Sequence, residues 1–339
     1  MRRFLALIAA LVVLGLVDPV SGQGPAFHDG KTIRVIVGLA AGGGYDTYAR
    51  LVARHLGRHV PGKPGVIVEN MTGAGGLIAA NHLYKIAKPD GLTMGHFNGS
   101  HMMGQVLGAP GIEFDARKFE FLGAAVKEDV VCGFTKASGI TSFEKWMAAR
   151  TPVKLGGVST GSPVDNSAKI LKAALGLPLQ IVSGYKGTAE IRLAADSGEL
   201  SGACWAWESM RATWRAGLDA GQVVVVLQLT DKGFPDLPGV PLAISFAKTD
   251  DARQLIQMAH YAGAYARPFY LPPGTPKERV RILRTAFEET LTDKAFLAEA
   301  EKIKLTIDPV NADELTRMVN GLFTLDPVLL ARLKDVLYR

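Results

Sequence analysis

The hydrophobic positions of the chain fall into short apolar runs that alternate with amphipathic segments. Runs of β-branched residues such as 33–38 (IRVIVG) and 223–229 (VVVVLQL) are typical of buried strands. After the first run, Tyr48, Leu51 and Val52 recur at helical spacing, with arginines at the positions between them. The first run therefore predicts a strand that leads into an amphipathic helix.

The same reasoning extends along the chain. Strands are predicted at 33–38, 65–70, 92–98, 119–136 (one or two), 152–158, 179–185, 198–209, 223–229 and 257–268, and helices at 45–58, 77–86, 142–150, 166–176, 188–198, 277–302 and 312–323. Strands that alternate with helices in this way indicate a mostly parallel α/β architecture. In 198–209 (GELSGACWAWES), strand alternation places Trp205 and Trp207 on one face.

Two of the predicted strand–helix junctions are rich in glycine. Residues 39–44 (LAAGGG) follow the first strand, and residues 72–76 (TGAGG) follow the second. The first N–H groups of a helix lack partners within the helix and carry the positive end of its dipole, so such loops suit a phosphate or a carboxylate. The alternative is that the glycines only form tight turns.

Nucleotides and nucleic acids fit the sequence less well than a small anion. Neither loop has the spacing G-x-G-x-x-G, and no Walker lysine follows either of them. The formal net charge of +6 includes Arg2 and Arg3, and the other basic residues are scattered among acidic ones. We expect neither a nucleotide cofactor nor nucleic-acid binding.

The N-terminus carries the features of an export signal. Residues 1–22 begin with two arginines, continue with an apolar stretch too short to span a membrane, and end at small residues. We predict a signal peptide with cleavage near Gly22, and no lipid anchor because no cysteine follows. The chain has 339 residues, of which 48% are hydrophobic, so the exported protein is expected to be soluble, with two domains.

Cysteines and histidines give weaker signals. Cys132 and Cys204 lie in separate strand-like runs and could pair if those strands are neighbours, but we expect two separate buried thiols. His55 and His59 are four residues apart without a third ligand nearby, so no metal site is expected.

A third loop fits a different function. Residues 157–161 (GVSTG) match G-x-S-x-G between a predicted strand and a helix, which is the setting of a hydrolase nucleophile. Ser159 would then be the nucleophile, and only His260 follows it in the order that such a triad needs. His260 lies in an apolar run, where a histidine is more often packed than catalytic, so a secreted α/β serine hydrolase is the alternative rather than the main prediction. The hydroxyls of Ser159, Thr160 and Ser162 favour an anion site at this helix start instead.

The stretch from Ile33 to Met94 resembles the substrate-binding proteins of the tripartite tricarboxylate transporters, the Bug or TctC-like receptors. These proteins typically read "AGG..D..AR", "VENRPGAGG" and "PDGYTL", where this chain has AGGGYDTYAR, VENMTGAGG and PDGLTM. Segments GYKGTAEIRLAADSGEL and LPPGTPKERVRIL are similar to later family motifs, so the resemblance covers nearly all of the mature chain.

The resemblance implies a type II periplasmic-binding-protein fold of the Venus-flytrap kind, with two α/β domains around a ligand cleft. Residues 31–128 and 244–339 would form domain 1, and residues 129–243 would form domain 2. The implied protein is a periplasmic monomer, not an enzyme and without a cofactor, that passes a small carboxylate to membrane permease subunits.

The glycine loops and the segments that would face them form the predicted ligand site. Its candidate residues are Ala41, Gly42, Gly43, Gly44, Asp46, Thr72, Gly73, Ala74, Gly75, Gly76, Asn98, Ser100, Ser159, Thr160, Gly161, Ser162, Tyr185, Gly187, Thr188 and Trp205.

Three of the residues near this site have open roles. Asp46 could contact the ligand, or it could cap the helix and pair with Arg50. Asp165 and Trp205 stand where family members often have histidine and aspartate, which favours a bulkier, less charged ligand than citrate, either a monocarboxylate or an aromatic or long-chain dicarboxylate. Trp205 could equally be a core residue.

Overall fold

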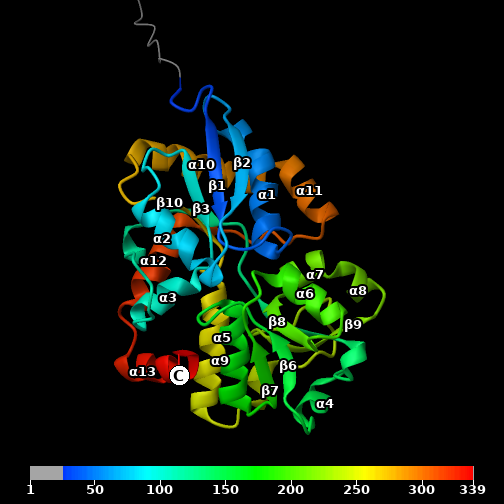
Figure 1. The fold of residues 1–339 in the computed structure, drawn as a ribbon. Helices are drawn as coiled ribbons and strands as arrows, with labels where there is room; N and C mark the ends of the chain where they lie inside the picture. The colour runs from blue at the N-terminus through cyan, green and yellow to red at the C-terminus, as the bar shows by residue number, and fades with distance from the viewer. Residues whose placement is uncertain (1–25, 339) are drawn as a thin grey trace, which may run out of the picture.

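The protein is described by a computed structural model over residues 26–338, and the predicted signal peptide (1–22) lies outside the described residues. Two β-sheets organise the chain, each with helices packed on it (Figure 1). We call the six-stranded sheet with its helices lobe I and the five-stranded sheet with its helices lobe II. No helix among the described residues is long and apolar enough to span a membrane.

Lobe I is built from the beginning and the later part of the chain, and its sheet has the order β11-β4-β10-β3-β1-β2. Its strands are β1 (Thr32–Val37), β2 (Gly65–Asn70), β3 (Thr93–His96), β4 (Glu120–Ala124), β10 (Pro268–Leu271) and β11 (Val310–Asn311). Its helices are α1 (Gly44–Leu56), α2 (Leu77–Lys85), α3 (Ser100–Val106), α10 (Lys277–Thr292), α11 (Lys294–Lys302) and α12 (Ala312–Leu322).

Lobe II is built mainly from the middle of the chain, and its sheet has the order β7-β6-β8-β5-β9. Its strands are β5 (Val130–Thr135), β6 (Val153–Gly156), β7 (Leu179–Val182), β8 (Gly202–Ala206) and β9 (Val223–Leu229). Its helices are α4 (Phe143–Met147), α5 (Pro163–Leu175), α6 (Thr188–Asp196), α7 (Trp207–Thr213), α8 (Arg215–Asp219), α9 (Asp250–Gly263) and α13 (Pro327–Tyr338).

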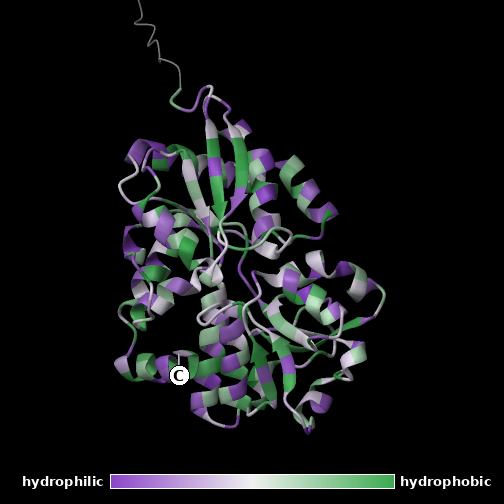
Figure 2. Cartoon of the chain, viewed as in Figure 1, coloured by the Kyte–Doolittle hydropathy of each residue, from purple (hydrophilic) through white to green (hydrophobic). Residues whose placement is uncertain are grey.

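The apolar runs that predicted strands lie inside these lobes. Ile33, Val35 and Val37 of β1 are fully buried on one face of the sheet, where they pack with residues of α1 and α10. Figure 2 shows strands of both sheets as hydrophobic and the helices as mixed. The strand and helix predictions before residue 198 are confirmed. The predicted helix 277–302 is interrupted at Asp293, whose carboxylate accepts hydrogen bonds from the N–H groups of Ala295 and Phe296 and so begins α11.

Three of the predictions on secondary structure are wrong. The sheets are mixed rather than mostly parallel, because β10 pairs antiparallel with β3 and β4, and β5 pairs antiparallel with β8 and β9. The segment around His260 is part of helix α9, which Thr249 caps. Strand β8 ends at Ala206 and Trp207 begins α7, so strand alternation does not relate the two tryptophans, although both are buried.

Cys132 and Cys204 form a disulfide, so the expectation of two separate thiols is wrong. The two cysteines are direct register partners on the adjacent strands β5 and β8, which the sequence order does not reveal because two other strands of the sheet, β6 and β7, lie between them in the chain. The bond closes a loop with a sequence separation of 72 residues. It joins β5 to β8, the central strand of the lobe II sheet and the strand that carries Trp205.

The chain crosses between the lobes in three places. Residues 125–129 join β4 to β5, residues 264–267 join α9 to β10, and residues 323–326 lead from α12 back to α13. Helices α9 and α13 both pack against α5 in lobe II (Figure 1). The first two crossings lie side by side, because the N–H of Glu128 donates to the carbonyl of Gly263 at 2.9 Å.

Replacing both cysteines with alanine should lower the free energy of unfolding by about 2–4 kcal/mol, because the loop that the disulfide closes is long. Denaturant unfolding with and without reductant measures this effect. The double variant provides the control, since reductant should destabilise the parent protein and leave the variant unchanged. A parent protein whose unfolding midpoint does not respond to reductant would contradict the assignment.

Candidate functional site

A cavity lies between the two lobes, where α1 of lobe I and α5 and α6 of lobe II begin. It has room of about 30 Å³ for the centres of water-sized groups. It is lined by Leu39, Gly43, Gly44, Tyr45, Asn98, Glu128, Val130, Val158, Ser162, Pro163, Val164, Gly187, Thr188, Trp205, Ala206 and Arg267. Seven of these residues were predicted from the sequence: Gly43, Gly44, Asn98, Ser162, Gly187, Thr188 and Trp205.

Two helices direct their N-termini at this cavity without a side-chain cap. The N-cap residues of α1 and α6 are Gly43 and Gly187, which cannot accept a hydrogen bond from the first turn. The third helix, α5, has Ser162 as its N-cap, and the hydroxyl of Ser162 accepts from the N–H of Asp165. The N–H of Gly44, the first residue of α1, donates to the hydroxyl of Thr188 at 3.4 Å. Two helix dipoles whose N-cap residues supply no side-chain acceptor therefore place positive potential in the cavity.

The loops from the two lobes touch at the rim of the cavity. The N–H of Ala40 donates to the carbonyl of Lys186 at 2.9 Å, and the hydroxyl of Ser100 donates to the carbonyl of Gly161 at 2.8 Å. A Cβ atom added at Gly75 would lie 2.3 Å from the hydroxyl oxygen of Ser159. Loop 72–76 therefore packs directly on loop 159–162 in this arrangement of the lobes.

Three buried hydrogen-bond donors on cavity residues have no partner among the described residues. They are the amide nitrogen of Asn98, the indole nitrogen of Trp205 and Nη1 of Arg267. The orientation of the Asn98 amide follows from its oxygen, which accepts from the N–H of Ser100. Buried donors without acceptors favour a ligand that supplies oxygen acceptors.

Arg267 forms the floor of the cavity together with Glu128. The guanidinium Nε lies 2.5 Å from the Glu128 carboxylate, and Nη2 donates to the hydroxyl of Ser209 at 2.7 Å. Arginine, glutamate and serine are all buried, and the guanidinium stacks over the ring of Tyr45. Burial alone would lower the pKa of Arg267, but the nearby carboxylates raise it above its ordinary value, so the guanidinium stays charged.

A second carboxyl, Glu208, lies 3.8 Å from Arg267 and is also buried. Burial raises its pKa to about 8, and the neighbouring Glu128 adds to the rise while Arg267 opposes it. Glu208 is therefore mainly protonated at neutral pH. The charges of Arg267 and Glu128 then cancel, and the potential for an anion comes from neutral donors and helix ends.

Asp46 has a structural position. Its carboxylate accepts hydrogen bonds from the N–H of Gly42, from Arg50 and from Asn70, at 2.8–2.9 Å. Burial opposes ionisation of this carboxyl, but these hydrogen bonds outweigh it and lower the pKa. Asp46 does not line the cavity; it fixes the shape of loop 39–43.

Asp165 also supports a loop rather than lining the cavity. Its buried carboxylate accepts from the N–H of Val158 and from the hydroxyls of Ser162 and Ser183. Tyr185, also predicted for the site, is half-buried and donates to Glu199. Of the remaining candidates, Ser100 lines a neighbouring cavity, and Ala41, Gly42, Thr72, Gly73, Ala74, Gly75, Gly76, Ser159, Thr160 and Gly161 lie in the loops outside the cavity lining.

Sequence reasoning missed Tyr45, Glu128 and Arg267. Arg267 carried a signal, since it is a single charge between the apolar segments GAYA and PFYL, whereas Glu128 lies within the charged triplet KED and carried none. Charged residues in such runs are rarely buried unless they are paired. Nothing in the sequence links these two positions, which are 139 residues apart.

The geometry gives the hydrolase alternative no base. The hydroxyl of Ser159 has no hydrogen-bond partner among the described residues. His260 instead lies 3.2 Å from Asp231 and 3.6 Å from Asp129. A general base must be within hydrogen-bond reach of its nucleophile or one water away. Within residues 26–338, no group of three or more His, Cys, Asp or Glu residues is arranged to hold a metal ion.

Replacing Gly75 with valine should abolish ligand binding while most of the fold remains, because the side chain would separate loop 72–76 from loop 159–162. Gly176→Val is the matched control. Gly75 and Gly176 have nearly the same positive φ, +63° and +66°, but a Cβ at Gly176 meets no atom within 4 Å. Both variants carry the backbone strain, and only the first obstructs the cleft. Equal ligand affinities of the two variants by calorimetry would contradict this role of Gly75.

Glu208→Gln should flatten the dependence of stability on pH. Because the folded-state pKa is raised, Glu208 favours folding fully below its ordinary pKa of 4.5, and this contribution is lost as pH rises toward about 8. Denaturant midpoints between pH 5 and pH 8 should fall less steeply for Glu208→Gln than for the parent or for the exposed control Glu288→Gln. Parallel slopes for all three proteins would show that Glu208 is ionised throughout.

Comparison with known proteins places the chain among solute receptors. The family model described as "Tripartite tricarboxylate transporter family receptor" matches residues 48–323. A UPF0065 protein from the TAR-I ttuE-ttuC' intergenic region of Agrobacterium vitis is 28% identical over 60% of this chain and 57% of its own length. Another, in the gbd 5' region of Cupriavidus necator, is 38% identical over 27% of this chain and 28% of its own. The chain thus spans between about a quarter and somewhat over half the length of these curated relatives.

Solved structures share the fold. MatC from Rhodopseudomonas palustris with bound malate has a TM-score of 0.70 at 20% identity, covering 91% of this chain and 99% of its own. Periplasmic binding protein BugD has 0.73 at 20% identity (91% and 98% covered), and an adipate-bound R. palustris protein has 0.72 at 21% (90% and 98% covered). These structures confirm the predicted two-lobed binding-protein fold. With a family model that matches most of its length, the chain belongs to the tripartite tricarboxylate transporter family receptors.

Proposed function

We propose that this protein captures a small carboxylate in the cavity between its lobes and delivers it to the membrane permease of a tripartite tricarboxylate-type transporter. The observation that carries the proposal is the set of buried donors without partners on Asn98, Trp205 and Arg267, beside two uncapped helix N-termini. A carboxylate supplies acceptors for these donors, and the dipoles stabilise its charge. Relatives with bound malate and adipate support the same ligand class.

The proposal includes a periplasmic location after removal of the leader, and action as a monomer without catalysis. It also includes closure of the two lobes about the ligand. The hinge is placed at crossings 125–129 and 264–267, because α9 packs on α5 and β9. This assignment differs from the domain boundary at residue 244 that is predicted from the sequence, because the second crossing lies later in the chain, at residues 264–267. It also assigns α13 to lobe II, so that α13 moves with that lobe.

A thermal-shift screen of the mature protein against mono- and dicarboxylates tests the proposal. A true ligand at about a hundred times its dissociation constant adds about 2.7 kcal/mol to the free energy of unfolding. Matched primary amides of the same acids serve as controls, because they keep the carbon skeleton and lose the charge. Stabilisation by the amides equal to that by the acids would contradict carboxylate recognition.

Trp205→Phe should weaken carboxylate binding by about 0.5–1.5 kcal/mol, since phenylalanine keeps an aromatic ring against Trp214 and removes the N–H donor. Trp146→Phe is the matched control: Trp146 is also buried with an unpartnered indole nitrogen, but it packs against Phe134 and Phe143 away from the cavity. Calorimetric affinities that fall equally in both variants would indicate a general packing effect, and an unchanged affinity of Trp205→Phe would remove this donor from the site.

Ser159→Ala distinguishes the receptor from a hydrolase. Under the proposal, the variant binds carboxylates with at most a modest loss of affinity, because the Ser159 hydroxyl lies at the rim. An esterase would lose all turnover of activated esters in the same variant. Turnover by the parent protein that disappears in Ser159→Ala would contradict the proposed function.

A further inference from the structure

A second cavity, which we call the annex, adjoins the carboxylate cavity. It has room of about 50 Å³ for the centres of water-sized groups, and it lies between α5, α9 and α13 of lobe II and the start of α3 in lobe I. Glu128, Val130 and Pro163 line both cavities, so the two spaces meet at the hinge. The annex therefore lies next to the space in which the carboxylate head is proposed to bind.

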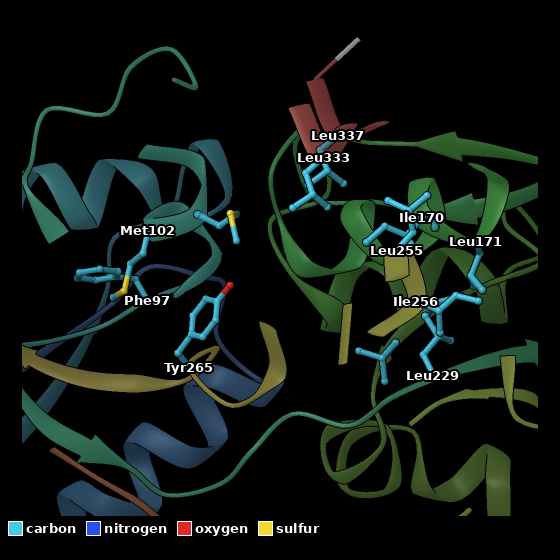
Figure 3. Close-up of a cluster of buried hydrophobic side chains, with 14 of the residues drawn as sticks. Phe97, Met102, Ile170, Leu171, Leu229, Leu255, Ile256, Tyr265, Leu333 and Leu337 are labelled. Atoms are coloured by element: carbon cyan, nitrogen blue, oxygen red, sulfur yellow. The ribbon is translucent and has the colours of Figure 1, made fainter. Parts of the chain in front are cut away.

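The walls of the annex are mainly apolar. They include Met103 of α3, Ile170 of α5, Met258 of α9, and Leu333 and Leu337 of α13. Figure 3 shows Leu333 and Leu337 beside Ile170, with Tyr265 and Met102 across from them. Methionine side chains adapt to ligands of different shape, and apolar walls give a carbon chain the surroundings that it prefers to water.

The polar side chains that line the annex either form hydrogen bonds or ion pairs within the protein or are buried away from solvent. Ser100 donates to Gly161, Ser167 donates to Pro163, and Glu128 is paired with Arg267. The hydroxyl of Tyr265 and the side-chain oxygen of Asn166 are buried without partners. An apolar tail therefore breaks no existing hydrogen bond there. A second carboxylate would find no lysine or arginine among the lining residues. The two helix starts in the lining, at Ser100 and Pro163, are already capped, because the Asn98 oxygen accepts from the N–H of Ser100 and the Ser162 hydroxyl accepts from the N–H of Asp165. The neutral hydroxyl of Tyr265 alone does not offset the cost of burying a second charge.

We propose that the ligand is an amphipathic monocarboxylate, whose head binds at the glycine loops and Arg267 and whose apolar tail of several carbons occupies the annex beneath α13. This inference rests on the proposed function and narrows its ligand class. The C-terminal helix takes part in specificity, since Leu333 and Leu337 close the far side of the annex.

Isothermal calorimetry with butanoate, hexanoate, octanoate, suberate and 1-octanol tests the inference on the unmodified mature protein. Affinity should rise by about fourfold for each added methylene up to octanoate, because each is buried against apolar walls. Suberate, the matched acid with a second carboxylate at its end, should bind at least about tenfold more weakly than octanoate. Suberate binding as tightly as octanoate would overturn the proposal of an apolar tail.

The remaining outcomes separate this inference from the proposed function. If the short acids bind and chain length has no effect, the annex is not part of the ligand site, while the receptor proposal stands. If 1-octanol binds as tightly as octanoate, or no acid binds, recognition of the carboxylate head fails and the proposed function is contradicted.

A filled annex provides the variant test. Ala262→Phe on α9 places a ring in the annex and should reduce the affinity for octanoate by at least about tenfold, with little change for butanoate. Gln254→Phe, at an exposed position of the same helix, is the matched control and should bind both acids as the parent does. If Ala262→Phe fails to fold, Leu337→Ala, which enlarges the annex, should shift the preference toward longer acids. Octanoate affinities unchanged in a folded Ala262→Phe would also overturn the proposal.

Discussion

The salt bridge between Arg267 and Glu128 holds together the two crossings of the chain between the lobes, and the ligand cavity is built on it. Both residues lie in the segments that cross between the lobes rather than in either sheet, and the guanidinium also reaches Ser209 of α7 and the ring of Tyr45 of α1. A buried ion pair gains little net stability over an apolar pair, but loss of one partner costs about 3–5 kcal/mol. The pair therefore constrains where the two lobes meet.

Because of this pairing, the charged side chains near the cleft and the groups that attract an anion are different. With Glu128 compensating Arg267 and Glu208 mainly protonated, the floor of the cavity carries little net charge. Attraction for an anion then depends on the first turns of α1 and α6, where glycine at the N-cap supplies no side-chain acceptor. Asp46 and Asp165 hold the preceding loops in shape through backbone and side-chain hydrogen bonds. Carboxylates close to the cleft thus serve its geometry without repelling an anionic ligand.

The local part of this arrangement could be predicted from the sequence, and the long-range part could not. The strands and helices follow from apolar periodicity, and the junctions between them follow from glycines such as Gly43. Both signals are local, because they depend only on residues a few positions apart in the chain. The disulfide between Cys132 and Cys204 and the pair Arg267–Glu128 depend on strand order and chain crossing, which periodicity does not encode. The helix around His260 was mistaken for a strand because its apolar residues are nearly continuous. Trp205 was placed in the cleft through the family resemblance, and it lines the cavity while also stacking on Trp214.

The central claim is that neutral donors and Arg267 together bind a carboxylate between the lobes. A crystal structure of the mature protein with a bound carboxylate tests it most directly. The account predicts carboxylate oxygens at about 3 Å from Arg267 Nη1, the Asn98 amide nitrogen and a first-turn N–H of α1 or α6. A carboxylate bound outside this cavity, or one turned away from these donors toward solvent, would contradict it.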